Sequence, residues 1–253
     1  MLISSSEWVL GDRPTALRRT HAAGFDAVEL DATPGVDVAR LRDDLSEAGL
    51  VVPSLCWGWS GDRELGSPDA ASRRAAQEYL LRSLEFAVDL GASQLVVLPA
   101  CRSIPWDDDE PRERGLDRAG AAIAEVLADA PADVAVALEA LHREESFLMN
   151  TLDDAEGLRS RIDDARVGLV ADLYHMVHEE EDMIDSLRRH ADAITLVHLA
   201  APERGPLLAS TPGVDGLVAQ LRAMPGIRSA TLEFLVRDDD ALLADSVAFA
   251  RTL

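Results

Sequence analysis

Four ionisable residues follow four short apolar runs in the second half of the chain. The runs are Val134–Leu138, Val167–Ala171, Ile194–Val197 and Ala230–Leu232, and the residues that follow them are Glu139, Asp172, His198 and Glu233. If the runs are neighbouring parallel strands, about 4.8 Å apart, these four side chains converge on one point. A single acid after a strand usually caps a helix or faces solvent, but four in succession favour a functional site.

Three carboxylates and one imidazole form a typical set of ligands for a divalent cation. Bringing these charged groups together without a counter-charge would cost free energy, and a bound cation would offset that cost. A structural zinc site would more often use cysteine. We therefore expect one divalent metal ion, Mn²⁺ first, with Mg²⁺, Co²⁺ or Zn²⁺ as alternatives, held by Glu139, Asp172, His198 and Glu233.

Such a site suits chemistry at a carbon next to a carbonyl group. A divalent ion that bridges the carbonyl and hydroxyl oxygens of an α-hydroxy ketone stabilises the enediolate left when a carbon-bound proton is removed. We expect Glu139 and Glu233 to be the acid/base pair, because they flank Asp172 and His198 in strand order. Return of the proton gives epimerisation or isomerisation, and loss of a β-hydroxyl gives dehydration.

The elements that position these residues alternate between strand and helix. We expect strands at Leu2–Ser4, Ala27–Leu30, Leu50–Leu55, Gln94–Leu98, Val134–Leu138, Val167–Ala171, Ile194–Val197 and Ala230–Phe234. We expect helices near 14–22, 37–48, 68–90, 112–129, 152–163, 181–191, 214–223 and 240–252. The pattern predicts an α/β fold, a (β/α)8 TIM barrel that forms a single domain over residues 1–253, with its site at the carboxyl ends of the strands. An open sheet would be expected to carry a glycine-rich loop after its first strand, and none is present.

Aromatic residues and cysteines fall in the loops on the expected catalytic side. Trp8, Trp57, Trp59 and Trp106 follow the first, third and fourth strands. Tryptophan rings pack against the C–H faces of sugars, so we expect Trp8 and Trp57 to contact substrate; the alternative is that the tryptophans anchor loops or a subunit interface. Cys56 and Cys101 match no zinc spacing and are expected to be free buried thiols that line the same pocket. The acidic run from His178 to Glu181 is expected to be mostly a solvated face.

Composition excludes several classes of function. The chain of 253 residues has 46 acidic and 24 basic residues, a net charge of −22, and every basic residue is arginine. Without lysine it cannot form the Schiff base of an aldolase or a pyridoxal phosphate enzyme. The charge argues against nucleic acid as a partner, and no apolar run is long enough for a membrane span. We expect a cytoplasmic protein with a small-molecule partner, either a monomer or a homo-oligomer.

Motifs in the second half add a resemblance to a known family. Gly24–Leu30, Asp172–Met176, and His198 with Arg204 six residues later resemble segments of the xylose isomerase-like TIM barrel superfamily. The chain looks most like the D-tagatose and D-psicose 3-epimerases, followed by the hydroxypyruvate isomerases. The resemblance implies the same four metal ligands, and it implies that His175, Arg204 and Glu145 contact substrate. His142 stands where the epimerases have asparagine.

The leading hypothesis is a divalent-metal-dependent sugar or keto-sugar isomerase or epimerase that works through an enediolate. The alternative is a metal-dependent dehydratase of the inosose or dehydroshikimate type on the same barrel. A repair nuclease resembling endonuclease IV would need more histidines than the six present and a less acidic surface. A barrel that only binds a ligand would not need the complete set of metal ligands. The sugar, its stereocentre and any phosphate group are left open by the sequence.

Overall fold

Short runs of valine, leucine, isoleucine and alanine form the central sheet, because buried parallel strands are apolar on both faces. The structure is a computed structural model that describes residues 1–236 and 239–253. Its strands are β1 Leu2–Ser6, β2 Ala27–Asp31, β3 Ser54–Cys56, β4 Gln94–Val97, β5 Ala135–Glu139, β6 Val167–Asp172, β7 Ile194–Leu199 and β8 Ser229–Leu232. Each strand pairs in parallel with the next and β8 pairs with β1, so the sheet is a closed barrel. The predicted (β/α)8 fold is confirmed.

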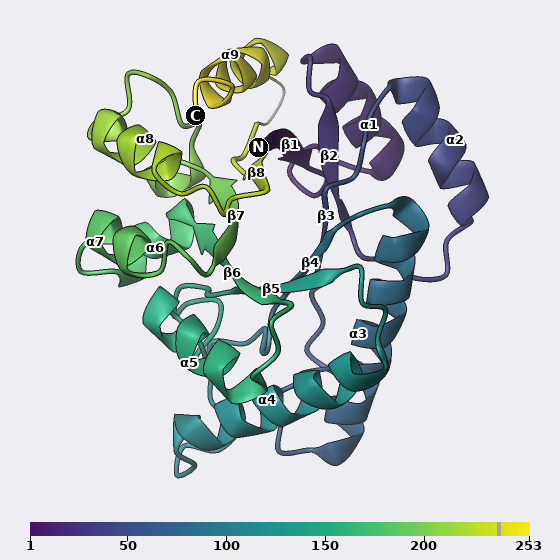
Figure 1. The fold of residues 1–253 in the computed structure, drawn as a ribbon, viewed down its shortest axis with the longest axis vertical. Helices are drawn as coiled ribbons and strands as arrows, with labels where there is room; N and C mark the ends of the chain where they lie inside the picture. Colours follow the sequence, from purple (N-terminus) through teal and green to yellow (C-terminus); the bar gives the residue numbers. More distant parts are fainter. Residues whose placement is uncertain (237–238) are drawn as a thin grey trace.

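Helices surround the strands as an outer ring (Figure 1). They are α1 Arg13–Ala22, α2 Val38–Ala48, α3 Ala70–Leu90, α4 Arg112–Asp129, α5 Leu152–Ile162, α6 Leu173–Glu179, α7 Met183–Arg189, α8 Val214–Arg222 and α9 Asp240–Ala250, with a 3-10 turn η1 at Pro202–Arg204. Aspartates such as Asp37 and Asp69 cap the first turns with their side chains. Among the described residues, no helix is both long and apolar enough to cross a membrane.

One local prediction is wrong and another is met only in part. The third strand covers Ser54–Cys56 rather than Leu50–Leu55, because Val51 makes only an isolated bridge to Ala27 and Pro53 has no N–H to donate. In the acidic run, His178 and Glu181 are exposed as expected, but Glu179, which ends the unpredicted helix α6, is not. The Glu179 side chain is 2% exposed and binds Arg143, with Oε2 2.6 Å from the guanidinium.

The interior of the barrel has an apolar layer and a polar layer. The apolar layer consists of Cys56, Val96, Ala137, Val170 and Leu196. The buried polar residues include Ser4, Glu29, Ser54 and Thr231, which are joined by hydrogen bonds. The strand register then fixes the site above them, because Asp172 pairs directly with His198 across β6 and β7.

Candidate active site

The four residues that end or follow strands β5 to β8 lie together at the barrel mouth. Glu139 ends β5, Asp172 ends β6, His198 lies in β7, and Glu233 follows β8. The His198 Nδ1 atom is 2.8 Å from a Glu139 carboxylate oxygen, 3.5 Å from one of Asp172 and 3.4 Å from one of Glu233. One potential ligand atom from each residue lies within 4.8 Å of the others, so the group could hold a metal ion.

The electrostatics of this group fit the binding of a cation. Burial raises the pKa of Glu139 to about 8 and also raises the pKa of Glu233, against the attraction of His198. Burial opposes ionisation of Asp172 as well, but His175 and His198 hold the pKa of Asp172 well below its usual value. Among the described residues, the buried atoms Asp172 Oδ2 and His198 Nδ1 have no hydrogen-bond partner. A divalent ion would coordinate such unpaired oxygen and nitrogen atoms.

His175 lies beside this group in a fixed orientation. Its Nδ1 accepts a hydrogen bond from the backbone N–H of His142 at 3.2 Å, and the His142 Nδ1 is 2.7 Å away. The proton of a neutral His175 ring is therefore on Nε2, which is 3.7 Å from the Asp172 carboxylate. Burial lowers the pKa of His175 to about 4, so the ring is a neutral hydrogen-bond donor at physiological pH.

Arg204 reaches the site from η1 and is held between two aromatic rings. Its guanidinium carbon lies 4.8 Å from the ring centre of Trp8 and 4.5 Å from that of Tyr174. The guanidinium is 3.5 Å from Glu233 and 3.7 Å from Glu145. The indole N–H of Trp8 also donates to Glu233 at 2.6 Å.

The backbone under Arg204 is strained. Glu203 and Arg204 both have positive φ, 65° and 54°, which side chains other than glycine rarely adopt. Outliers of this kind persist where the surroundings fix them, often at functional sites. Here the turn is closed by a pair of backbone contacts between Ala201 and Gly205.

A cavity of about 310 Å³ opens above the four-residue group. It is lined by Trp8, Asp31, Cys56, Trp57, Gly58, Trp59, Leu98, Glu139, Leu141, Glu145, His175, Arg204 and Glu233. All the residues predicted to contact substrate therefore border it. Trp106 does not: its indole binds Glu64 and its ring packs on Phe147. Cys101 lines a neighbouring hollow instead.

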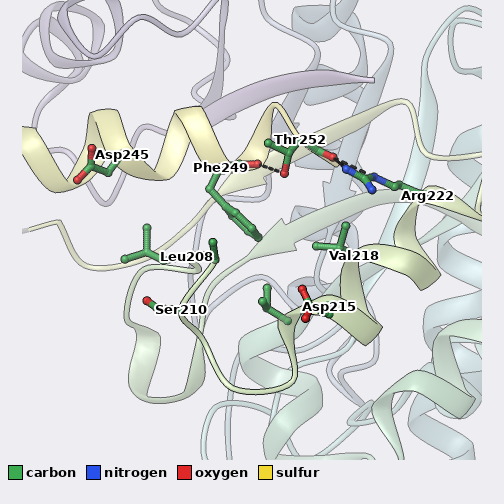
Figure 2. A pocket seen from close by; sticks show the side chains of 10 residues that line it. Leu208, Ser210, Asp215, Val218, Arg222, Asp245, Phe249 and Thr252 are labelled. Carbon is green, nitrogen blue, oxygen red and sulfur yellow. Dashed lines mark hydrogen bonds between the residues drawn. The ribbon is translucent and has the colours of Figure 1, made fainter.

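A larger hollow of about 660 Å³ lies between α8, α9 and the loop before α8 (Figure 2). Arg222 there donates to the backbone carbonyl of Thr252, and Phe249 covers the middle of the hollow. Of the lining residues only Asp215, Asp245 and Arg222 are charged. No group of potential metal ligands found among the described residues includes any of them. The barrel mouth is therefore the candidate site.

Two acidic residues and one histidine at the site were not predicted from the sequence. Asp31 ends β2 and borders the cavity, where burial, followed by the charge of Glu7, raises its pKa to about 6. His142 orients His175, as described above. Glu29 is completely buried below the group and lies 3.3 Å from His198. A charged residue inside the apolar run Ala27–Leu30 was the available signal, because such residues are almost never fully buried unless paired.

Comparison with known proteins agrees with this geometry. The family model described as xylose isomerase-like TIM barrel matches residues 17–227. The chain belongs to this family. It is 31% identical to a ketose 3-epimerase of Arthrobacter globiformis over 206 residues, which are 79% of this chain and 69% of the relative. It is 28% identical to 3-dehydro-D-guloside 4-epimerase of Escherichia coli K12 over 239 residues, 90% of each chain.

A solved structure shows the same fold. D-Psicose 3-epimerase of Clostridium cellulolyticum H10, determined with D-tagatose, superimposes with a TM-score of 0.88 at 20% identity, over 99% of this chain and 98% of the other. The predicted resemblance to the ketose 3-epimerases is thus confirmed. The chain is an enzyme of the isomerase and epimerase class.

Proposed function

We propose that this protein is a divalent-metal-dependent epimerase or isomerase of keto-sugars. The observation that carries the proposal is the position of Glu139 and Glu233. Both border one cavity, and both belong to a compact group with Asp172 and His198. Epimerase relatives that match 79–90% of the chain support the same reaction class.

The residues divide into those that hold an ion and those that move a proton. Asp172 and His198 would hold the ion from β6 and β7, and Glu139 and Glu233 would complete its coordination. Bound there, an ion with carboxylate and imidazole ligands, Mn²⁺ in our proposal, supplies Lewis-acid stabilisation of a substrate oxyanion. One glutamate removes the carbon-bound proton and the other delivers a proton to the opposite face.

Neighbouring groups orient Glu233 and offer contacts to the substrate for these steps. Trp8 and Arg204 fix the carboxylate of Glu233 from two directions. His175 lines the cavity, and its Nε2–H could donate to a developing oxyanion, as could Arg204. The exposed ring of Trp59 and the buried ring of Trp57 offer faces for the C–H surface of a sugar.

The charges in the cavity support an uncharged substrate. Asp31, Glu139, Glu145 and Glu233 line it, and among the described residues Arg204 is the one arginine in the lining, already shared between Glu145 and Glu233. A phosphate or carboxylate group would meet these acids without a further arginine of the described lining to pair with it. We therefore propose a keto-sugar without a phosphate group.

The test is exchange of the substrate proton with solvent. Wild-type enzyme with Mn²⁺ is incubated in D2O with a panel of free ketoses and 3-keto-glycosides, the two substrate types in the relatives' names. We expect epimerised product that carries deuterium. Glu139→Gln and Glu233→Gln should each lower turnover by about 10²–10⁴-fold, because a general acid or base is lost.

The matched control is Glu144→Gln, which removes a carboxylate with an 88% exposed side chain close to the cavity. It should keep wild-type turnover. Loss of water with a new enone absorbance would identify the dehydratase instead. Absence of both products and of exchange across the panel would overturn the proposal.

A further inference from the structure

Glu29 is a buried carboxylate that the proposed reaction does not use. It lies in the middle of β2 with no exposed surface, beneath the group that we propose binds metal. We infer that Glu29 is a positioning residue: it holds the Nε2–H of His198, so that the Nδ1 lone pair faces the metal site. The inference rests on the proposed function, because it concerns the same site.

The two nitrogens of the His198 ring face different surroundings. Nδ1 is 2.8–3.5 Å from carboxylate oxygens of Glu139, Asp172 and Glu233. Nε2 points the other way, and the acidic group near it is Glu29, with Oε1 at 3.3 Å. A neutral imidazole has one N–H and one lone pair. The lone pair serves an ion only on the side of the three carboxylates, so the proton belongs on Nε2.

Both atoms of the contact lack any other partner. His198 Nε2 and Glu29 Oε1 are each buried without a hydrogen bond within the described part of the chain. Two unsatisfied groups, a potential donor and an acceptor, therefore face each other across 3.3 Å. Such contacts often shorten when the site is loaded.

The other oxygen of Glu29 is anchored to the barrel wall. Ser54 on β3 donates to Oε2 at 2.6 Å, and Thr231 on β8 lies 3.3 Å from the same atom. Ser4 on β1 in turn binds the Thr231 hydroxyl at 2.9 Å. These contacts from three strands leave Oε1 pointing at His198. Metal-binding histidines commonly donate their second N–H to a carboxylate, which fixes the ring and makes it a better ligand.

The experiment compares two buried substitutions of the same length. Glu29→Met removes the acceptor for Nε2–H. Gln94→Met removes a polar side chain that is also completely buried in the barrel wall and whose amide lies 3.4 Å from Ser229 Oγ, which is none of the four proposed ligands. We expect the Mn²⁺ dissociation constant, measured by titration of folded protein, to rise about 10–100-fold for Glu29→Met and to stay within about 3-fold for Gln94→Met. Glu29→Gln keeps an acceptor oxygen, so its Mn²⁺ dissociation constant should lie between those of Glu29→Met and wild type.

A spectroscopic readout tests the contact even if Glu29→Met does not fold. In wild-type protein loaded with diamagnetic Zn²⁺, the Nε2–H proton of His198 should resonate further downfield than in Glu29→Gln, because a carboxylate is a stronger acceptor than an amide oxygen. The same Nε2–H shift in both proteins, or unchanged Mn²⁺ affinity in folded Glu29→Met, overturns the inference while the proposed function stands. If wild type itself binds no Mn²⁺, the proposed function fails as well.

Discussion

At the scale of single residues, Glu139 and Glu233 share one neighbour and differ in the others. Both lie close to His198, but Glu233 is also held by the Trp8 indole and by Arg204. Asp172 has another task, because its carboxylate also caps α6 by accepting the N–H groups of Tyr174 and His175. We therefore propose that Glu139 and Glu233 move protons, whereas Asp172 supports the ion and caps its helix.

This separation predicts a difference that a metal titration can measure. Asp172→Asn should weaken Mn²⁺ binding and lose activity at low metal, and excess Mn²⁺ should restore a large part of it, since an amide oxygen still coordinates and asparagine still caps a helix. Glu139→Gln should stay inactive at every Mn²⁺ concentration. The measurement is turnover of each variant across the titration. The assignment is wrong if Glu139→Gln recovers at high metal and Asp172→Asn does not.

The sequence predicted the residues of the site that stand at strand ends. Glu139, Asp172, His198 and Glu233 could be found in this way because each follows an apolar run and a barrel brings all strand ends to one face. Glu29 was detectable only as a charge inside an apolar run, and the partners of Glu29 and His142 could not be predicted, because these are contacts across the barrel, to His198 and His175. Side-chain contacts of that kind produce no recognisable spacing pattern in the sequence.

At the scale of elements, the turn η1 combines strain with a site residue. Glu203 is exposed and has φ 65°, so a glycine there would relieve strain without removing a buried contact. Glu203→Gly should raise the free energy of unfolding by roughly 0.5 kcal/mol. Glycine removes the cost of a left-handed backbone, and this gain outweighs the extra conformational entropy that glycine loses on folding. Activity should be unchanged, because Glu203 does not line the cavity.

The matched control for this prediction is Ala209→Gly. Ala209 is also exposed in the following loop, but its φ is not positive, so the same change should lower stability slightly. Chemical denaturation of the two variants and wild type gives the comparison. Equal destabilisation by both substitutions would contradict the view that this turn is strained.

Elements with strong periodicity were predicted well, and short ones were not. The long helix α3, for example, ends before Gly91 as its pattern indicates, with φ 72° at that glycine. The seven-residue helix α6 was missed because its N-cap is Asp172, which the sequence showed only as a candidate ligand. The start of β3 was misplaced because Pro53 follows Val51 and Val52 and interrupts their pairing.

At the scale of the whole molecule, the net charge is the dominant feature. The 24 arginines cannot neutralise 46 acidic residues, even though many of them pair, as Arg118 does with Glu110. Like charges repel across the folded surface, and salt screens this repulsion.

We therefore predict that salt stabilises the metal-free enzyme. Raising NaCl from 10 mM to 500 mM, with EDTA present, should increase Tm by about 2–4 °C, equivalent to roughly 1 kcal/mol. Calorimetry or circular dichroism checks this. A Tm that falls with salt would mean that the surface ion pairs outweigh the excess of negative charge.

Closure of the barrel between β1 and β8 also has a consequence during synthesis. Leu2 pairs with Ser229, so the first strand leaves the ribosome long before its second neighbour exists. Until then the nascent chain carries an open sheet edge, the kind of surface that associates with other chains. The four-residue group is delayed as well, because Glu233 is made just after β8. A growing chain can therefore gain both its closed barrel and the complete group of proposed metal ligands only after β8 and Glu233 have been synthesised.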